Sequence, residues 1–194
     1  DGIANIATTQ FIMIYDITMP TIGSILDGVL DDLDWFNAPD SLIATWTGFS
    51  DSLSGISEYE YAIGMGVGLT DVLDWTSAGS DTTVTPTELT LSDGITYYTS
   101  VHAIDMAGNV SADTSTNGVT IDMSPPTQGI VNDGEGDDID RTTSFTTLSA
   151  NWSGFDDLLS GIAYFEYAVG TAPGDTNVVT WTTTGQNMFY SRDD

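Results

Sequence analysis

The stretch WTGFSDSLSGI at residues 46–56 decides the fold, because it recurs as WSGFDDLLSGI at residues 152–162, an offset of 106 positions. Working outward, the same offset relates residues 17–88 to residues 123–194 without a gap, with 28 identities in 72 positions. Chance does not supply so many matches in one register. The sequence therefore indicates a structural unit that occurs more than once along the chain.

The repeat also sets the expected domain boundaries. Asp16 and Asp122 stand at equivalent positions before two proline-containing linkers. We predict that residues 17–122 form one complete domain, that residues 1–16 are the last strand of a preceding repeat, and that residues 123–194 are an incomplete second domain. Two explanations stay open for the incomplete domain. Either the chain is a piece of a longer polypeptide, or a strand around Phe11–Tyr15 of one subunit completes the next subunit's domain.

Apolar and polar residues alternate in three runs of the repeat. The buried positions expected from these runs are Leu42, Ala44 and Trp46; Tyr59, Tyr61 and Ile63; and Tyr97, Val101 and Ala103. A period of two predicts strands with one buried face, and clusters of Gly, Pro, Asp and Ser separate the runs. We predict an all-β sandwich of about seven short strands per repeat, with Trp46 between the sheets and the Tyr97 hydroxyl hydrogen-bonded near the preceding loop.

A family resemblance rests on these positions. The run LSDGITY at residues 91–97, followed by Val101 and Ala103, resembles the fibronectin type III pattern around the sixth strand, and Trp46 fits the second strand. The resemblance implies tandem fibronectin type III-like (immunoglobulin-like) β-sandwiches. The segment at 46–56 and the turn DMAGN at 105–109 are similar to repeats of large microbial cell-surface proteins. Such modules serve as adhesive surfaces, spacers and enzyme accessories alike.

Charge and composition exclude several classes of function. The chain has 29 acidic and 2 basic residues, for a net charge of −27, which excludes nucleic acid as a partner because phosphate binding needs Lys and Arg. No apolar run approaches the roughly 20 residues that span a bilayer, so membrane insertion is not expected. With no Cys, disulfides, thiolate metal sites and Cys nucleophiles are excluded, and a single His leaves too little for histidine-based metal clusters or triads. Glu60 and Glu166 recur at one strand position, which indicates surface patterning and not a catalytic pair, so we expect no enzyme activity.

Two acidic patterns predict calcium sites. The loop DGVLDDLD at residues 27–34, repeated in similar form at residues 133–140, has the closely spaced Asp and Gly typical of calcium loops. A solvated loop is the alternative. In a string of sandwiches the linker enters beside two loops of the next domain, so we expect Asp16, Asp51, Asp105 and Asn109 to meet at one end of it. The alternative is that these side chains only stabilise local turns.

The same arrangement is expected at the next junction, where Asp122 and Asp157 would lie near the acidic loop of the domain before. The full set of predicted calcium ligands is Asp16, Asp31, Asp32, Asp34, Asp51, Asp105, Asn109, Asp122 and Asp157.

Exposed aromatic and basic side chains are the remaining candidates for binding. Trp75 and Trp181 are expected in an edge strand, and packing on their own domain is favoured over stacking on sugar. His102 alternates with Val101 and Ala103, so we expect it to point away from the core as an ordinary surface histidine, opposite Glu60.

A structural function follows from the repetition of a whole domain. We expect a tandem-repeat module of an extracellular filament or a cell-surface adhesin stalk, stiffened by calcium. Its expected partners are neighbouring repeats or copies of itself, and surface glycans. The alternative is an accessory, non-catalytic region of a secreted polysaccharide-degrading enzyme.

Overall fold

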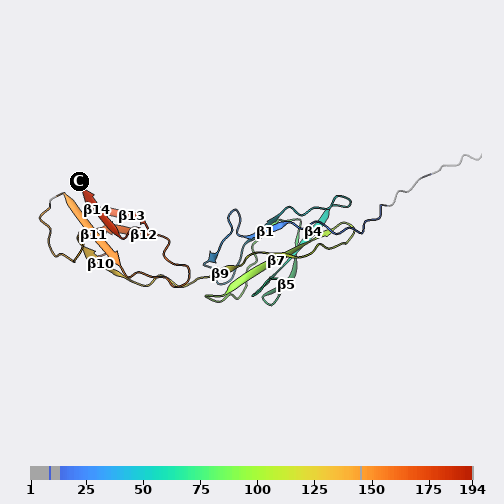
Figure 1. The fold of residues 1–194 in the computed structure, drawn as a ribbon, viewed down its shortest axis with the longest axis horizontal. Helices are drawn as coiled ribbons and strands as arrows, with labels where there is room; N and C mark the ends of the chain where they lie inside the picture. The colour runs from blue at the N-terminus through green and yellow to red at the C-terminus, as the bar shows by residue number, and fades with distance from the viewer. Residues whose placement is uncertain (1–8, 10–13, 145, 194) are drawn as a thin grey trace, which may run out of the picture. The chain divides into compact units, whose positions relative to one another are not determined.

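The regular structure of the described residues is entirely β-strand. The computed structural model describes residues 9, 14–144 and 146–193, and the chain divides after Ile121 into two compact units (Figure 1). Within those ranges, none of the structure is a helix of the length and hydrophobicity that crossing a membrane requires. The strand predicted around Phe11–Tyr15 lies mostly outside the described residues, and Ile14 and Tyr15 are exposed and belong to no strand.

The first unit is a sandwich of two sheets. One sheet has the strand order β1-β3-β6, and the other has the order β2-β9-β7-β4-β5, with β8 paired to β7. Neighbouring strands are antiparallel except β2 and β9, which are parallel. The strands are β1 (Ser24–Asp27), β2 (Trp35–Phe36), β3 (Ala44–Thr47), β4 (Ile56–Gly64), β5 (Leu73–Gly79), β6 (Thr83–Val84), β7 (Thr96–Asp105), β8 (Thr114–Ser115) and β9 (Val119–Ile121).

This strand order is that of the immunoglobulin-like sandwich that fibronectin type III domains share, so the predicted fold class is confirmed. The number of strands exceeds the expected seven or so because the two-residue strands β2 and β8 add to the larger sheet.

The alternating runs form the core as predicted. Trp46 of β3 is 1% exposed and packs edge-on against Tyr59 of β4, with ring centroids 5.7 Å apart. Val101 and Ala103 of β7 complete this cluster from the other sheet's central strand. Tyr97 is buried, and its hydroxyl accepts a hydrogen bond from the backbone N–H of Ser92 at 2.9 Å. The expectations for Trp46 and Tyr97 are confirmed.

The second unit has two smaller sheets. Their strand orders are β10-β11-β14 and β12-β13, with antiparallel pairing throughout. The strands are β10 (Ile130–Asp133), β11 (Thr147–Ser153), β12 (Phe165–Val169), β13 (Val179–Gly185) and β14 (Phe189–Asp193). β10, β13 and β14 begin 106 positions after β1, β5 and β6. The described part of this unit contains no counterpart of β7, β8 or β9.

Candidate metal centre

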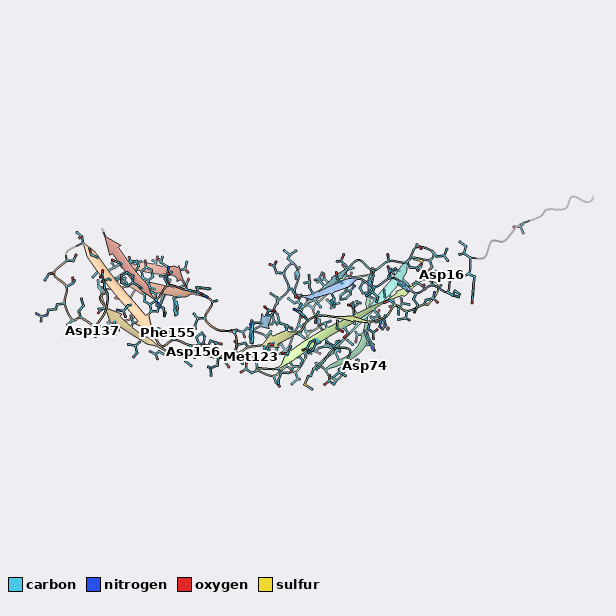
Figure 2. All side chains as sticks on the ribbon, viewed as in Figure 1. Asp16, Asp74, Met123, Asp137, Phe155 and Asp156 are labelled. Carbon is cyan, nitrogen blue, oxygen red and sulfur yellow. The ribbon has the colours of Figure 1, made fainter. Side chains whose placement is uncertain are left out.

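Three carboxylates from distant segments lie close together in the first unit. They meet at the end of the unit where Asp16 lies (Figure 2). Asp16 lies in the segment before β1, Asp51 in the loop between β3 and β4, and Asp105 at the last position of β7. One oxygen from each carboxylate lies within 4.8 Å of the others. The sandwich topology brings these loops to the same end, as expected from the sequence.

One oxygen of the Asp51 carboxylate accepts hydrogen bonds from its own loop. Oδ1 accepts hydrogen bonds from the backbone N–H groups of Leu53, Ser54 and Gly55, at 2.9, 2.8 and 3.2 Å. This is the local turn-stabilising role, and it fixes the orientation of the carboxylate. Oδ2 has only a long contact of 3.4 Å with the Thr18 hydroxyl, so it is directed toward the segment that carries Asp16.

Asp16 is the most unusual member of the group. Its Oδ1 accepts hydrogen bonds from the backbone N–H and the hydroxyl of Thr18, at 2.9 and 2.6 Å. The residue is 9% exposed, and its Oδ2 is buried without a hydrogen bond of good geometry among the described residues. The side chains of Ser54 and Asp51 lie close enough to contribute to the lowered pKa of Asp16. Burying a charged oxygen without a partner costs free energy. A cation bound between the carboxylates would remove that cost.

Asp105 is held by the turn that follows β7. Its Oδ1 accepts hydrogen bonds from the backbone N–H groups of Ala107 and Asn109, both at 2.8 Å. The side-chain amide of Asn109 donates to Asp105 Oδ2 at 2.8 Å and to the backbone carbonyl of Asp16 at 3.3 Å. The amide nitrogen of Asn109 thus joins the two aspartates as a hydrogen-bond donor, and the prediction that Asn109 is a calcium ligand stays a prediction.

The hydrogen bonds keep at least two of these groups ionised. The side-chain and backbone hydrogen bonds from Thr18 lower the pKa of Asp16. Burial opposes ionisation of Asp105, but the hydrogen bonds from Asn109 and Ala107 outweigh it, so its pKa is also lowered. Two carboxylates about 4 Å apart repel each other by about 1 kcal/mol in water-like surroundings and about 4 kcal/mol near a protein surface. Residues 1–121 contain no Lys or Arg to offset that repulsion.

The acidic loop of the first unit is organised around a structural aspartate. Asp27 is 1% exposed, and its backbone N–H donates to Asp32 Oδ1 at 2.9 Å. Burial raises the pKa of Asp27 to about 6. Within the described residues, Asp31, Asp32 and Asp34 are not gathered into a group of three like that of Asp16, Asp51 and Asp105.

The second unit repeats part of the arrangement. Asp122 Oδ2 accepts a hydrogen bond from the backbone N–H of Ser160 at 3.1 Å, and Ser160 lowers the pKa of Asp122. Asp157 Oδ1 accepts the backbone N–H groups of Leu159, Ser160 and Gly161, just as Asp51 does in its own loop. In the described part of the second unit, Asp122 and Asp157 are the counterparts of Asp16 and Asp51.

Sequence reasoning missed the surroundings of His102. His102 is 8% exposed, and the two nitrogens of its imidazole lie 3.1 Å from Glu60 and 3.0 Å from Asp113. Trp75 covers it, with ring centroids 4.2 Å apart. The expected contact between His102 and Glu60 is present, and Trp75 packs on its own domain, as predicted. The expectation that His102 is an ordinary surface histidine was wrong. The burial comes from Trp75 on another strand, and the alternation of residues within one strand gives no information about such a contact. The counterpart Trp181 is 65% exposed.

Comparisons with known proteins add little beyond this geometry. No family model matches the sequence, and no curated protein is found to be similar to it. Among solved structures, the crystal structure of the FN1–FN3 domains of chicken CNTN1 is similar, with a TM-score of 0.43 and 12% sequence identity. The match covers 91% of this chain and 56% of that chain, so the chain spans little more than half the length of that structure.

Proposed function

We propose that this chain is a structural module of an extracellular filament or cell-surface stalk, in which Ca²⁺ held by Asp16, Asp51 and Asp105 fixes the entering segment to the sandwich. The carrying observation is the buried, unpartnered Oδ2 of Asp16 inside a group of three carboxylates. Asp16 lies in the segment that enters the unit, whereas Asp51 and Asp105 belong to the sandwich itself. A shared cation would therefore restrain the segment relative to the strands.

Calcium suits this donor set better than other biological cations. It takes six to eight oxygen ligands in a flexible geometry, and carboxylates and backbone carbonyls supply them. Zinc and copper favour His and Cys, and the chain has no Cys. Magnesium demands a near-ideal octahedron and loses its water reluctantly. The three carboxylates accept different sets of hydrogen bonds from their own segments, so they fit the more flexible geometry of calcium.

The proposal that this chain is part of a string of tandem domains rests on the sequence repeat. Tandem domains provide length, and each copy keeps its own core. In such a string a cation at the entrance of each unit would limit bending at the linkers. The proposed partners are accordingly neighbouring repeats or further copies of the chain, with surface glycans as a second class of ligand.

The proposal is tested by measuring whether calcium restrains the entering segment. Because the chain has no cysteine, Ile17→Cys gives a single site for a nitroxide label beside Asp16. We expect Ca²⁺ to slow the motion of this label, measured by electron paramagnetic resonance, and Asp105→Asn to abolish the effect. A label at Val67→Cys, an exposed position between β4 and β5, serves as the control and should not respond. Equal responses at both positions, or no response at saturating Ca²⁺, would contradict the proposal.

A further inference from the structure

The connection between β8 and β9 contains a bulge at residues 117–118. Before the bulge, the backbone N–H of Thr116 donates to the Thr99 carbonyl of β7 at 2.9 Å, and the Thr116 hydroxyl accepts the Thr99 N–H at 3.1 Å. After the bulge, Val119 lies opposite Tyr97. Two residues therefore lie opposite a single residue of β7, which is the pattern of a β-bulge.

The two residues of the bulge are Asn117 and Gly118, which form the only Asn-Gly pair in the chain. In such a pair the glycine nitrogen can attack the side-chain carbonyl carbon of the asparagine and close a succinimide ring, because glycine has no Cβ to obstruct the approach. The Asn117 side chain is exposed, and among the described residues nothing is hydrogen-bonded to it. Its amide is therefore free to turn back toward the Gly118 nitrogen, in reach of water.

The Gly118 nitrogen also has a base in contact with it. Its N–H donates to Oδ2 of Asp27 at 3.2 Å, which is within the reach of a general base. Burial raises the pKa of Asp27 to about 6, so the carboxylate is ionised at pH 7 and holds a proton more strongly than an exposed aspartate. The N–H lies in the peptide plane, whereas the nitrogen attacks from a face of that plane. The hydrogen bond therefore does not obstruct ring closure.

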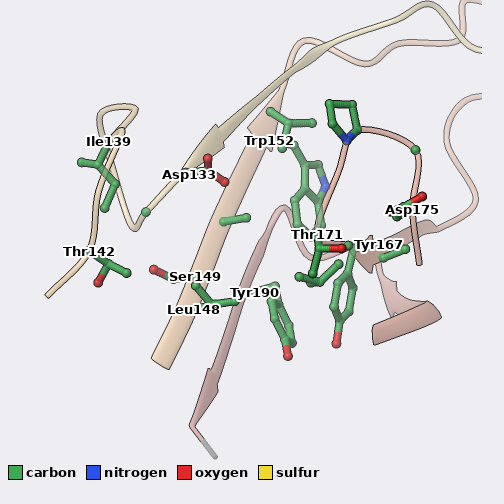
Figure 3. Close-up of a pocket in the computed structure, with 18 of the residues that line it drawn as sticks. Asp133, Ile139, Thr142, Leu148, Ser149, Trp152, Tyr167, Thr171, Asp175 and Tyr190 are labelled. Atoms are coloured by element: carbon green, nitrogen blue, oxygen red, sulfur yellow. The ribbon is translucent and has the colours of Figure 1, made fainter. Parts of the chain in front are cut away.

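The equivalent aspartate of the second unit has a different environment. The Asp133 backbone N–H donates to Asp138 at 3.0 Å, as Asp27 donates to Asp32 in the first unit. Asp133 is nevertheless exposed, on the wall of a cavity of about 870 Å³ (Figure 3). The local loop alone thus does not bury this carboxylate, and in the first unit the segment that carries Gly118 lies against it.

We propose that Asn117 is a site of spontaneous covalent modification in which Asp27 acts as the general base. The Gly118 nitrogen bonds to Cγ of Asn117 as its proton passes to Asp27. The Cγ–Nδ2 bond then breaks, and the leaving nitrogen takes that proton and departs as ammonia. Water opens the succinimide ring, either at Cγ to give aspartate or at the backbone carbonyl to give isoaspartate. Nothing is oxidised or reduced, and the reaction does not depend on the calcium site.

The products fit the bulge poorly. While the ring is closed, the Gly118 nitrogen carries no proton, so the buried Asp27 carboxylate loses this donor at a cost in free energy. Isoaspartate adds a methylene to the main chain, where even a Cβ on Gly118 would lie 2.7 Å from the Tyr98 ring. It also adds a negative charge close to Asp27. We therefore expect the modified chain to have a lower Tm than the unmodified chain.

The test incubates the full chain at pH 7 and follows Asn117 by peptide mass spectrometry, with fragmentation that distinguishes aspartate from isoaspartate. We expect faster conversion in the folded chain than in the same chain unfolded in urea, because folding brings the base to the nitrogen. Asp27→Asn keeps an acceptor oxygen but removes the base, so it should slow conversion at Asn117 at least about tenfold. This substitution creates a second Asn-Gly pair with Gly28, so the two sites are read on separate peptides.

Two further variants complete the experiment. Asp81→Asn, which removes an exposed carboxylate between β5 and β6, should leave the rate unchanged. Asn117→Gln should stop the reaction, because its longer side chain closes the ring poorly, and the incubated variant should keep its Tm. A folded wild type that converts no faster than the unfolded chain would overturn the proposal, whether or not Asp27→Asn folds. A wild-type rate in a folded Asp27→Asn, checked by circular dichroism, would overturn it as well.

Discussion

The Asp27 carboxylate in β1 accepts a hydrogen bond at 3.2 Å from the backbone N–H of Gly118, 91 residues later in the chain. Gly118 directly precedes β9, so this bond connects the smaller sheet to the edge region of the larger one. The carboxylate is almost completely removed from water. Burial of the carboxylate therefore couples closure of the sandwich to its protonation, whereas the hydrogen bond from Gly118 favours the ionised form.

Asp27 is expected to make stability depend on pH. Its folded-state pKa of about 6 lies above the ordinary aspartate value of 3.8, so its contribution to stability is fully present below pH 4 and is lost as the pH rises through 6. The shift corresponds to at most about 3 kcal/mol. We expect Asp27→Asn to remove this loss and to raise the free energy of unfolding at pH 7 relative to wild type. Urea denaturation between pH 4 and pH 8 measures the difference.

The control for this prediction is Asp81→Asn, which removes one exposed carboxylate in the loop between β5 and β6. It should keep the wild-type pH dependence. Parallel curves for wild type and Asp27→Asn would show that the buried carboxylate does not titrate in this range.

Calcium and sodium should affect stability differently. A ligand that binds only the folded state at 100 times its Kd stabilises by about 2.7 kcal/mol. We therefore expect millimolar Ca²⁺ to raise the Tm more than Na⁺ at matched ionic strength, which provides only screening. Differential scanning calorimetry measures both. Identical effects from the two ions would leave screening as the whole explanation.

Asp16→Asn should change the stability of the protein in opposite directions with and without Ca²⁺. Without Ca²⁺ the variant is expected to be more stable than wild type, because it removes one charge from three close carboxylates. With Ca²⁺ it should be less stable than wild type, because one ligand is lost. The Tm measured with and without Ca²⁺ tests both signs, and Asp81→Asn again supplies the control for charge alone.

Truncation of Trp46 tests the core. The side chain is almost completely buried against Tyr59 and Tyr61, so Trp46→Ala should cost about 3–5 kcal/mol. Loss of near-ultraviolet circular dichroism and a lower urea midpoint are the expected results. A cost below about 1 kcal/mol would be inconsistent with a filled space at this position.

Gly118 tests a close approach between backbone and side chains. Its φ is 97°, and a Cβ there would lie 2.7 Å from the Tyr98 ring and 2.8 Å from the Thr96 methyl group. Gly118→Ala should therefore cost more than Gly68→Ala, where φ is 72° but nothing lies within 4 Å of the added carbon. We expect about 1 kcal/mol for Gly68→Ala and about 2–3 kcal/mol for Gly118→Ala. Equal costs would mean that Tyr98 moves aside freely.

The sequence predicted the features that depend on local pattern. The alternation of apolar and polar residues predicted that Trp46, Tyr61 and Val101 lie in the core, because the residues of each strand determine which of its faces is buried. The repeat offset and the sandwich topology were enough to predict that Asp16, Asp51 and Asp105 lie together.

Features that depend on distant partners were not predictable in the same way. Asp27 was assigned to an acidic calcium loop, but its environment is set by Gly118. His102 is buried because Trp75 of β5 lies over it. The amide nitrogen of Asn109 donates to the backbone carbonyl of Asp16, which lies 93 residues earlier in the chain. In each case the deciding contact joins segments that lie far apart in the sequence and that no local pattern relates.

The parallel pairing of β2 with β9 has a mechanical consequence. Trp35 lies opposite Thr120 and Phe36 opposite Ile121, and β9 is the last strand before the chain leaves the unit. A stretching force applied through the two ends of the unit, once β1 has detached, pulls β2 and β9 in opposite directions along their length. The hydrogen bonds between them are then loaded together, in shear, instead of opening one after another. The fold thus places the β2–β9 pair, which resists shear, at the point where tension along a string of such units would act.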